Sequence, residues 1–201
     1  MKERGIIFNA EMVRAILDGR KTQTRQVINW RRTRFTEIGE RDDGTQWPWS
    51  EDCEKACDYW HECPFGDIGD RLWVRETFGL RVVRDALGGT GEFLTYRASK
   101  PDAVYCAWDG GYIPMKWRPS SQMTRWRSRI LLEITGVRVE RLQDISQEDA
   151  HAEGFEGYDD DVSGGMPPYS EFGQAWVDIY GKDSWRENPW VWVIEFKRIQ
   201  G

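Results

Sequence analysis

A lysine, two threonines and an arginine lie within five residues, directly after a predicted helix end at Gly19: Lys21, Thr22, Thr24 and Arg25. Because a helix that ends on glycine turns the chain sharply, these side chains can converge near one point. A lysine can serve as the base for a threonine nucleophile when burial lowers the lysine pKa. The alternative is a solvated helix end, where basic side chains complement the helix dipole.

A second group of residues with chemical potential lies further along, in a polar segment. Three cysteines and one histidine fall within eleven positions: Cys53, Cys57, His61 and Cys63. In a reducing compartment, ligands at such short spacing can form a structural zinc site. A metal would there replace the apolar core that the segment lacks. The alternative is a set of separate thiols beside a loop histidine.

Cations and aromatic rings also alternate just after the first motif. The residues concerned are Arg25, Trp30, Arg31, Arg32, Arg34 and Phe35. Such a patch suits the phosphate and base of single-stranded RNA. The alternative is a solvated run of charges.

The overall charge limits the partners of the chain. Its 201 residues carry a formal net charge of −6, so we expect no charge-driven binding to duplex DNA. This balance favours a small modified nucleoside and still allows a few stacked bases. The 12 tryptophans predict an aromatic-rich core. No apolar run reaches the length of a membrane span and no secretory signal is visible, so we predict a cytoplasmic protein with reduced cysteines.

Hydrophobic periodicity predicts the elements that position these residues. We expect helices over 10–18, 147–153 and about 172–180, and strands over 5–8, 70–77, 92–97, 129–141 and 190–199. Asn9 and Ser146 are predicted N-caps, and Gly136 is predicted to bend the long strand. Residues 26–69 form a long polar insertion. Because no regular strand-helix-strand rhythm is present, we expect one α+β domain over 1–201, a mixed, partly closed β-barrel with flanking helices.

Four stretches together resemble a known family. They are 19–25 (Gly-Arg-Lys-Thr-Gln-Thr-Arg), 69–76 (Gly-Asp-Arg-Leu-Trp-Val-Arg-Glu), 145–154 and 190–196. These stretches are similar to those of ASCH-domain proteins of the PUA-like superfamily, of the type encoded by phages and prophages. The resemblance implies a PUA-like β-barrel with a cleft between barrel and helices. It also implies the activity of the small family members, amidohydrolases that remove the acetyl group from N4-acetylcytidine.

The resemblance also implies roles for individual residues. Lys21 corresponds to the family's base, Thr24 to its nucleophile and Glu153 to its acid. Glu148, one helical turn before Glu153, is the competing candidate for the acid. This set needs no cofactor, since amide hydrolysis requires only a nucleophile, a base and an acid.

Further residues are expected around the substrate. They are Arg20, Thr22, Arg25, Trp73 and Arg75. Backbone N–H groups of the turn at 22–24 could hold the oxyanion of the reaction. One departure concerns 120–125, which reads Ser-Ser-Gln-Met-Thr-Arg where phage relatives have Ser-Ile-His-Met-Pro-Arg. The change bears on what that loop binds and on whether hydrolase activity is inherited.

The sequence leaves two main functions open. The first is an amidohydrolase that acts on an N4-acylated cytidine through Lys21, Thr24 and Glu153. The second is a PUA-like reader that binds RNA or a modified base without chemistry. A third, a phage accessory protein that contacts host proteins, is supported by no particular residue.

Overall fold

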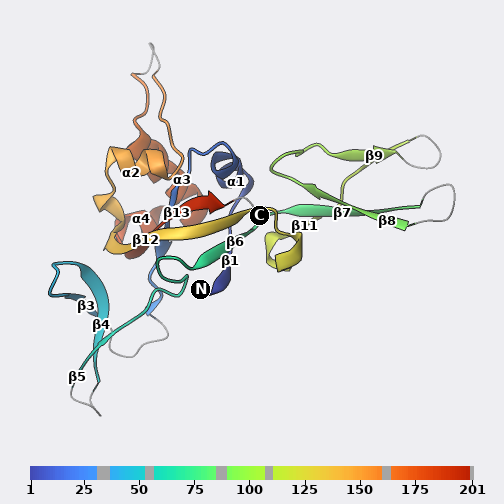
Figure 1. The fold of residues 1–201 in the computed structure, drawn as a ribbon. Helices are drawn as coiled ribbons and strands as arrows, with labels where there is room; N and C mark the ends of the chain where they lie inside the picture. The colour runs from blue at the N-terminus through green and yellow to red at the C-terminus, as the bar shows by residue number, and fades with distance from the viewer. Residues whose placement is uncertain (31–36, 53–56, 85–89, 107–110, 160–163, 200–201) are drawn as a thin grey trace.

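The computed structural model describes residues 1–30, 37–52, 57–84, 90–106, 111–159 and 164–199. Its centre is a five-stranded sheet in the order β1-β6-β12-β13-β2 (Figure 1). The strands are β1 (Glu3–Ile7), β6 (Arg71–Arg75), β12 (Leu131–Arg141), β13 (Trp190–Ile199) and β2 (Gln23–Val27). The pair β1–β6 is parallel and the other pairs are antiparallel. This mixed sheet confirms the expected α+β class.

Both faces of the sheet are covered, so β13 is buried on both sides. Its alternate residues Trp192, Ile194 and Phe196 join one core with α1 (Ala10–Leu17) and β1. Val191 and Val193 join a second core. There they pack with α2 (Gln147–Ala152) and α3 (Pro168–Tyr180), beside the short α4 (Lys182–Arg186). The sheet therefore separates two apolar cores, and β2 lies at its edge between them.

The sheet curls but does not close in the part of the chain that the structure describes. Strand β1 pairs with β6 and strand β2 pairs with β13, and these two edge strands do not pair with each other. Ile7 of β1 and Thr24 of β2 nevertheless line the same small cavity. The predicted closed part of the barrel is thus replaced by a gap between two facing sheet edges, which α1 connects along the chain.

The predicted polar insertion has a sheet of its own. Strands β3 (Glu37–Glu40), β4 (Gln46–Asp52) and β5 (Cys57–Trp60) form an antiparallel sheet. Its Trp47 packs edge-on against Trp192 at 5.0 Å between ring centroids. The insertion is therefore joined to the main core by aromatic side chains, which its low periodicity did not predict.

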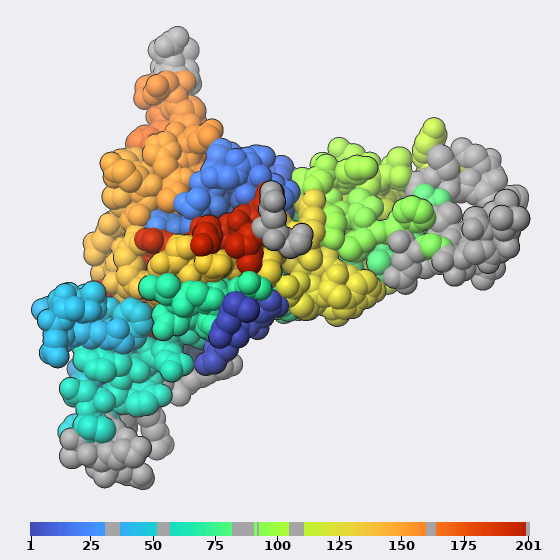
Figure 2. All heavy atoms as spheres, in the orientation of Figure 1, coloured from blue at the N-terminus to red at the C-terminus, as the bar shows by residue number. Residues whose placement is uncertain are grey.

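A second excursion forms an arm between β6 and β12. It consists of β7 (Phe78–Arg84), β8 (Thr90–Tyr96), β9 (Val104–Cys106), β10 (Tyr112–Pro114) and β11 (Trp117–Arg118). Strands β11, β7 and β8 make one antiparallel sheet, and β10 pairs with β9. The arm projects away from the central sheet and its helices (Figures 1 and 2). Among the described helices none is long and apolar enough to cross a membrane.

Candidate active site around Lys21 and Glu153

The turn after α1 is held by backbone hydrogen bonds to two helices. The N–H groups of Arg20 and Lys21 both donate to the carbonyl of Ala15, at 2.9 and 3.0 Å. The N–H of Thr22 donates to the carbonyl of Ala152 at 2.7 Å. These bonds satisfy carbonyls that the ends of α1 and α2 leave without helical partners. They also fix the position of Lys21 between the two helices.

Lys21 forms a buried ion pair with Glu153. Both side chains are almost fully enclosed, and Lys21 Nζ lies 2.5 Å from Glu153 Oε2 and 3.0 Å from the Glu153 carbonyl oxygen. Glu153 caps the C-terminus of α2, and Gly154 follows with φ of 98°. A Cβ on Gly154 would lie 3.2 Å from Lys21 Cβ, so the missing side chain allows the close approach. Glu148 is exposed.

Burial changes the protonation of Lys21. Loss of solvent around the ammonium lowers the pKa of Lys21 below its ordinary value, and the nearby Arg25 lowers it further. The attraction of Glu153 opposes this effect without cancelling it. The ring of Phe8 lies 5.7 Å from Nζ on another side. Lys21 is therefore in the environment that a lysine base requires.

Arg25 holds the other oxygen of Glu153. Its Nη1 lies 3.1 Å from Glu153 Oε1, and its side chain is fully buried. The same guanidinium lies 3.0 Å from Asp149 Oδ2 and binds the carboxylate of Glu140. Arg138 extends the network to Asp149, at 3.0 Å, and to Glu140. Arg25, a predicted substrate contact, lines the Thr24 cavity, and its guanidinium binds three carboxylates.

Sequence reasoning missed the three outer members of this network, Asp149, Glu140 and Arg138. One signal was present: Arg138 and Glu140 alternate along β12, so that they share one face of the strand. Opposite charges at such spacing on a half-buried strand indicate a paired cluster. These residues connect to Arg25 because α2 lies over the sheet. The sequence pattern did not predict that position of α2.

Thr24 is buried on β2, next to Arg25 in the chain. It lines a cavity of about 50 Å³ together with Glu153 and Ile7. Side chains of α3 close this cavity, among them Trp176 and Tyr180. Among the described residues, the Thr24 hydroxyl forms no hydrogen bond and Lys21 Nζ donates to Glu153 alone. The structure thus brings Lys21 and Glu153 into contact and places Thr24 at the same cavity without a bond to either.

Tyr180 is a further residue at this cavity that the sequence did not single out. Burial and the charge of Glu153 raise the pKa of the Tyr180 phenol. A phenol hydroxyl is a hydrogen-bond donor in its protonated form, so Tyr180 adds a polar group to the lining of the cavity.

The backbone hydrogen bonds of β2 limit which N–H groups can form the predicted oxyanion site. Phe196 N donates to the Thr22 carbonyl, and Ile28 N donates to the Trp190 carbonyl. The backbone N–H and C=O groups of the even-numbered residues of β2 therefore point toward β13. The N–H groups of Gln23 and Arg25 point to the open edge instead. Since the Thr22 N–H is bonded to Ala152, only Gln23 of the predicted turn 22–24 offers a donor at this edge.

The remaining predicted substrate contacts lie outside the Thr24 cavity. Arg20 donates to the carbonyl of Gly154 at 3.0 Å, and Thr22 is exposed. Arg75 binds the carbonyls of Ser120 and Ser121 and lies 5.4 Å from the ring of Trp73. Arg75 therefore anchors the 120–125 segment, in which the chain departs from its phage relatives.

The predicted zinc ligands are partly described. Cys63 is buried in the main core, which raises the pKa of its thiol to about 11. Cys57 is exposed, and His61 Nε2 lies 3.0 Å from Ser50 Oγ. Within the described residues no three potential ligands form a metal-binding group. Cys53 lies outside these residues, as do Arg31, Arg32, Arg34 and Phe35 of the predicted basic patch, so the zinc site remains a prediction.

A wider groove lies on the outer side of Glu153. It has a volume of about 420 Å³ and runs between α1 and α3. Arg20, Glu11 and Asp178 contribute charged groups to its walls. Glu153 and Phe155 line both this groove and the Thr24 cavity. Glu153 therefore lies between a smaller and a larger space.

No protein-family model matches the chain, and no curated protein matches it. Among solved structures, the chain is similar to the high-resolution crystal structure of an ASCH domain from Lactobacillus crispatus JV V101. The two share 12% sequence identity with a TM-score of 0.43, and the match covers 98% of this chain and 79% of the other.

Proposed function

We propose that this protein is an amidohydrolase that removes a small acyl group from a modified nucleoside, with N4-acetylcytidine as the first substrate to test. One observation carries the proposal: a fully buried lysine contacts a buried carboxylate beside a cavity that Thr24 lines. Burial of this kind adjusts an acid or base for catalysis near neutral pH. The resemblance of residues 19–25 to the family's catalytic motif is the reason for proposing amide hydrolysis as the reaction class.

The two spaces around Glu153 suit the two halves of such a substrate. The Thr24 cavity of about 50 Å³ matches an acyl group of a few heavy atoms, whereas the groove of about 420 Å³ falls in the usual range for small-molecule sites. A nucleoside amide held across Glu153 would present its carbonyl carbon to Thr24 and its amine to the groove. This arrangement favours short acyl groups over long ones.

The chemistry follows from these positions. In the proposed step Lys21 first passes its ammonium proton to Glu153, then takes the proton of the Thr24 hydroxyl as the oxygen attacks the acyl carbon, and Glu153 gives its proton to the departing amine. The backbone N–H of Gln23 or Arg25 stabilises the oxyanion at the open edge of β2. Water then releases the acyl group from Thr24 by the same proton path. The net reaction converts an amide and water into a carboxylic acid and an amine.

Turnover of N4-acetylcytidine by the purified protein tests the proposal, with cytidine and acetate measured as products. Thr24→Val is expected to abolish turnover because it keeps the shape and removes the hydroxyl, whereas Thr24→Ser is expected to retain part of it. Glu153→Gln is expected to lower the rate by about 10²-fold or more, and the matched exposed variant Glu148→Gln to leave it unchanged. Absence of turnover across a panel of N4-acylated nucleosides would contradict the proposal.

The absence of a hydrogen bond from Thr24 to Lys21 or Glu153 among the described residues favours a second candidate, a reader that binds a modified base without chemistry. In that case Lys21→Ala would weaken nucleoside binding, measured by tryptophan fluorescence, while no product forms with the wild-type protein. Binding with no turnover would therefore select the reader over the hydrolase.

A further inference from the structure

The arm formed by residues 78–118 differs from the rest of the chain in charge. It carries six basic and four acidic residues, whereas the remainder carries 22 basic and 30 acidic residues. The arm also holds seven aromatic residues. A net positive, aromatic-rich projection on a negatively charged protein is the part of the surface that can attract a polyanion.

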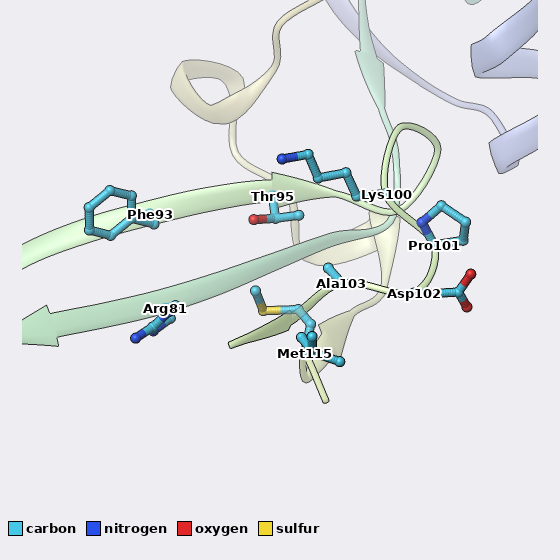
Figure 3. Close-up of a pocket in the computed structure, with 9 residues that line it drawn as sticks. Arg81, Phe93, Thr95, Lys100, Pro101, Asp102, Ala103 and Met115 are labelled. Carbon is cyan, nitrogen blue, oxygen red and sulfur yellow. The ribbon is translucent and has the colours of Figure 1, made fainter. Parts of the chain in front are cut away.

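A pocket of about 510 Å³ lies at the base of this arm (Figure 3). Arg81 of β7 pairs directly with Phe93 of β8, and Thr95 follows on the same face of the hairpin. Met115 and the 100–104 segment close the opposite side. In Figure 3 the side chain of Lys100 runs back along β8 in the direction of Phe93. Two cations, one aromatic ring and the carboxylate of Asp102 therefore border a single space.

The ring of Phe93 is available to a ligand. Phe93 is 59% exposed, and Val104 and Tyr112, on the adjoining hairpin, are 53% and 74% exposed. A cluster of large apolar side chains on one projecting element marks an interaction surface more often than a folding feature. An exposed ring beside basic groups offers a stacking platform for a base and a contact for its phosphate.

The base of the arm is joined to the rest of the chain by polar and cation–π contacts. Buried Glu76 accepts two hydrogen bonds from Arg129, at 2.8 and 2.9 Å, and Arg129 lies 4.0 Å from the ring of Tyr96. The Tyr96 hydroxyl in turn donates to the carbonyl of Arg127 at 2.8 Å. These contacts fix where the arm leaves the central sheet.

We propose that this arm pocket binds single-stranded nucleic acid, with a base stacked on Phe93 and the adjoining phosphates contacted by Arg81 and Lys100. A pocket of this volume fits a nucleotide, and the flipped, unpaired base that stacking requires is available only in a single strand. The site is distinct from the Lys21 site, so it binds its ligand whether or not Lys21 and Thr24 hydrolyse an amide.

Fluorescence anisotropy with labelled single-stranded RNA and DNA of about ten nucleotides tests the proposal. Phe93→Ala is expected to weaken binding roughly tenfold, and Phe93→Trp to restore it. Lys100→Ala is expected to reduce the slope of log affinity against log salt by about 0.7, the value for one phosphate contact on a single strand. Lys21→Met is expected to bind like the wild type, which separates this site from the proposed hydrolase.

The matched controls are Tyr158→Ala, an exposed ring between α2 and α3, and Lys182→Ala, an exposed cation on α4. Both are expected to leave affinity unchanged. Three results would overturn the proposal: no measurable binding of either oligonucleotide, equal affinity for base-free polyphosphate, or an affinity that Phe93→Ala does not change.

Discussion

The charged side chains of the Lys21 site are buried, whereas those of the arm pocket include an exposed lysine. Around Lys21, two cations are fully buried, and carboxylates from α2 and β12 pair with them. In the arm pocket, Lys100 is exposed and the ring of Phe93 is 59% exposed. Buried charges carry a desolvation cost that only their partners offset, whereas exposed groups remain free to meet a ligand. The charged groups of the first region are therefore paired within the fold, and the groups of the second are exposed at the surface.

The largest expected effect concerns the buried pair. Glu153→Ala leaves Lys21 and Arg25 without their shared carboxylate, and removal of one partner from a buried ion pair costs about 3–5 kcal/mol of unfolding free energy. Glu148→Ala, on the exposed side of the same helix, is expected to change stability by no more than about 0.5 kcal/mol. Urea unfolding of both variants measures the difference, and equal stabilities would show that the pair is not buried in solution.

The pH dependence of stability gives a smaller effect of known sign. Because the folded-state pKa of Lys21 lies below its ordinary value, the unfolded chain binds more protons than the folded chain between these two pKa values. Unfolding free energy should therefore rise with pH in that window, by up to about 1.4 kcal/mol per pH unit. Lys21→Met should remove this rise. A wild-type stability that falls with pH relative to Lys21→Met would contradict the assigned direction.

The smallest expected effect belongs to the arm. Phe93→Ala should change unfolding free energy by no more than about 0.5 kcal/mol, because its ring is mostly exposed. Phe78 is the matched control, since it begins the same hairpin and is fully buried, so that Phe78→Ala should cost about 3–5 kcal/mol. Thermal and urea unfolding compare the two. A large loss at Phe93 would mean that the ring supports the fold and is not held for a ligand.

Local sequence signals predicted many of the helices and strands. The Asn9 side chain accepts the Met12 N–H at 2.8 Å and begins α1, as its residue type indicated. The hydrophobic alternation over 190–199 predicted the strand β13. The pairing of β12 with β13 shifts register next to Gly136, where a bend was predicted. Caps and strand periods are properties of neighbours in the chain, so a sequence pattern contains them.

The outer parts of the site depend on packing instead. Contact between Arg25 and Asp149 joins an edge strand to a helix more than a hundred positions later in the chain, and no local pattern encodes that distance. The arm was missed for a similar reason. Residues 92–97 had a strand period, but the period does not say whether the strand joins the central sheet or pairs with β7 in a projecting hairpin.

The most direct test of the central claim is the rate of cytidine release from N4-acetylcytidine by the wild type and by Lys21→Met. Methionine fills the buried space and leaves Glu153 paired with Arg25, so the variant should keep its circular dichroism spectrum and its binding of single-stranded oligonucleotides. We expect hydrolysis by the wild type and a loss of about 10³-fold or more in the variant. Equal rates in the two proteins would contradict the claim that the buried lysine is the catalytic base.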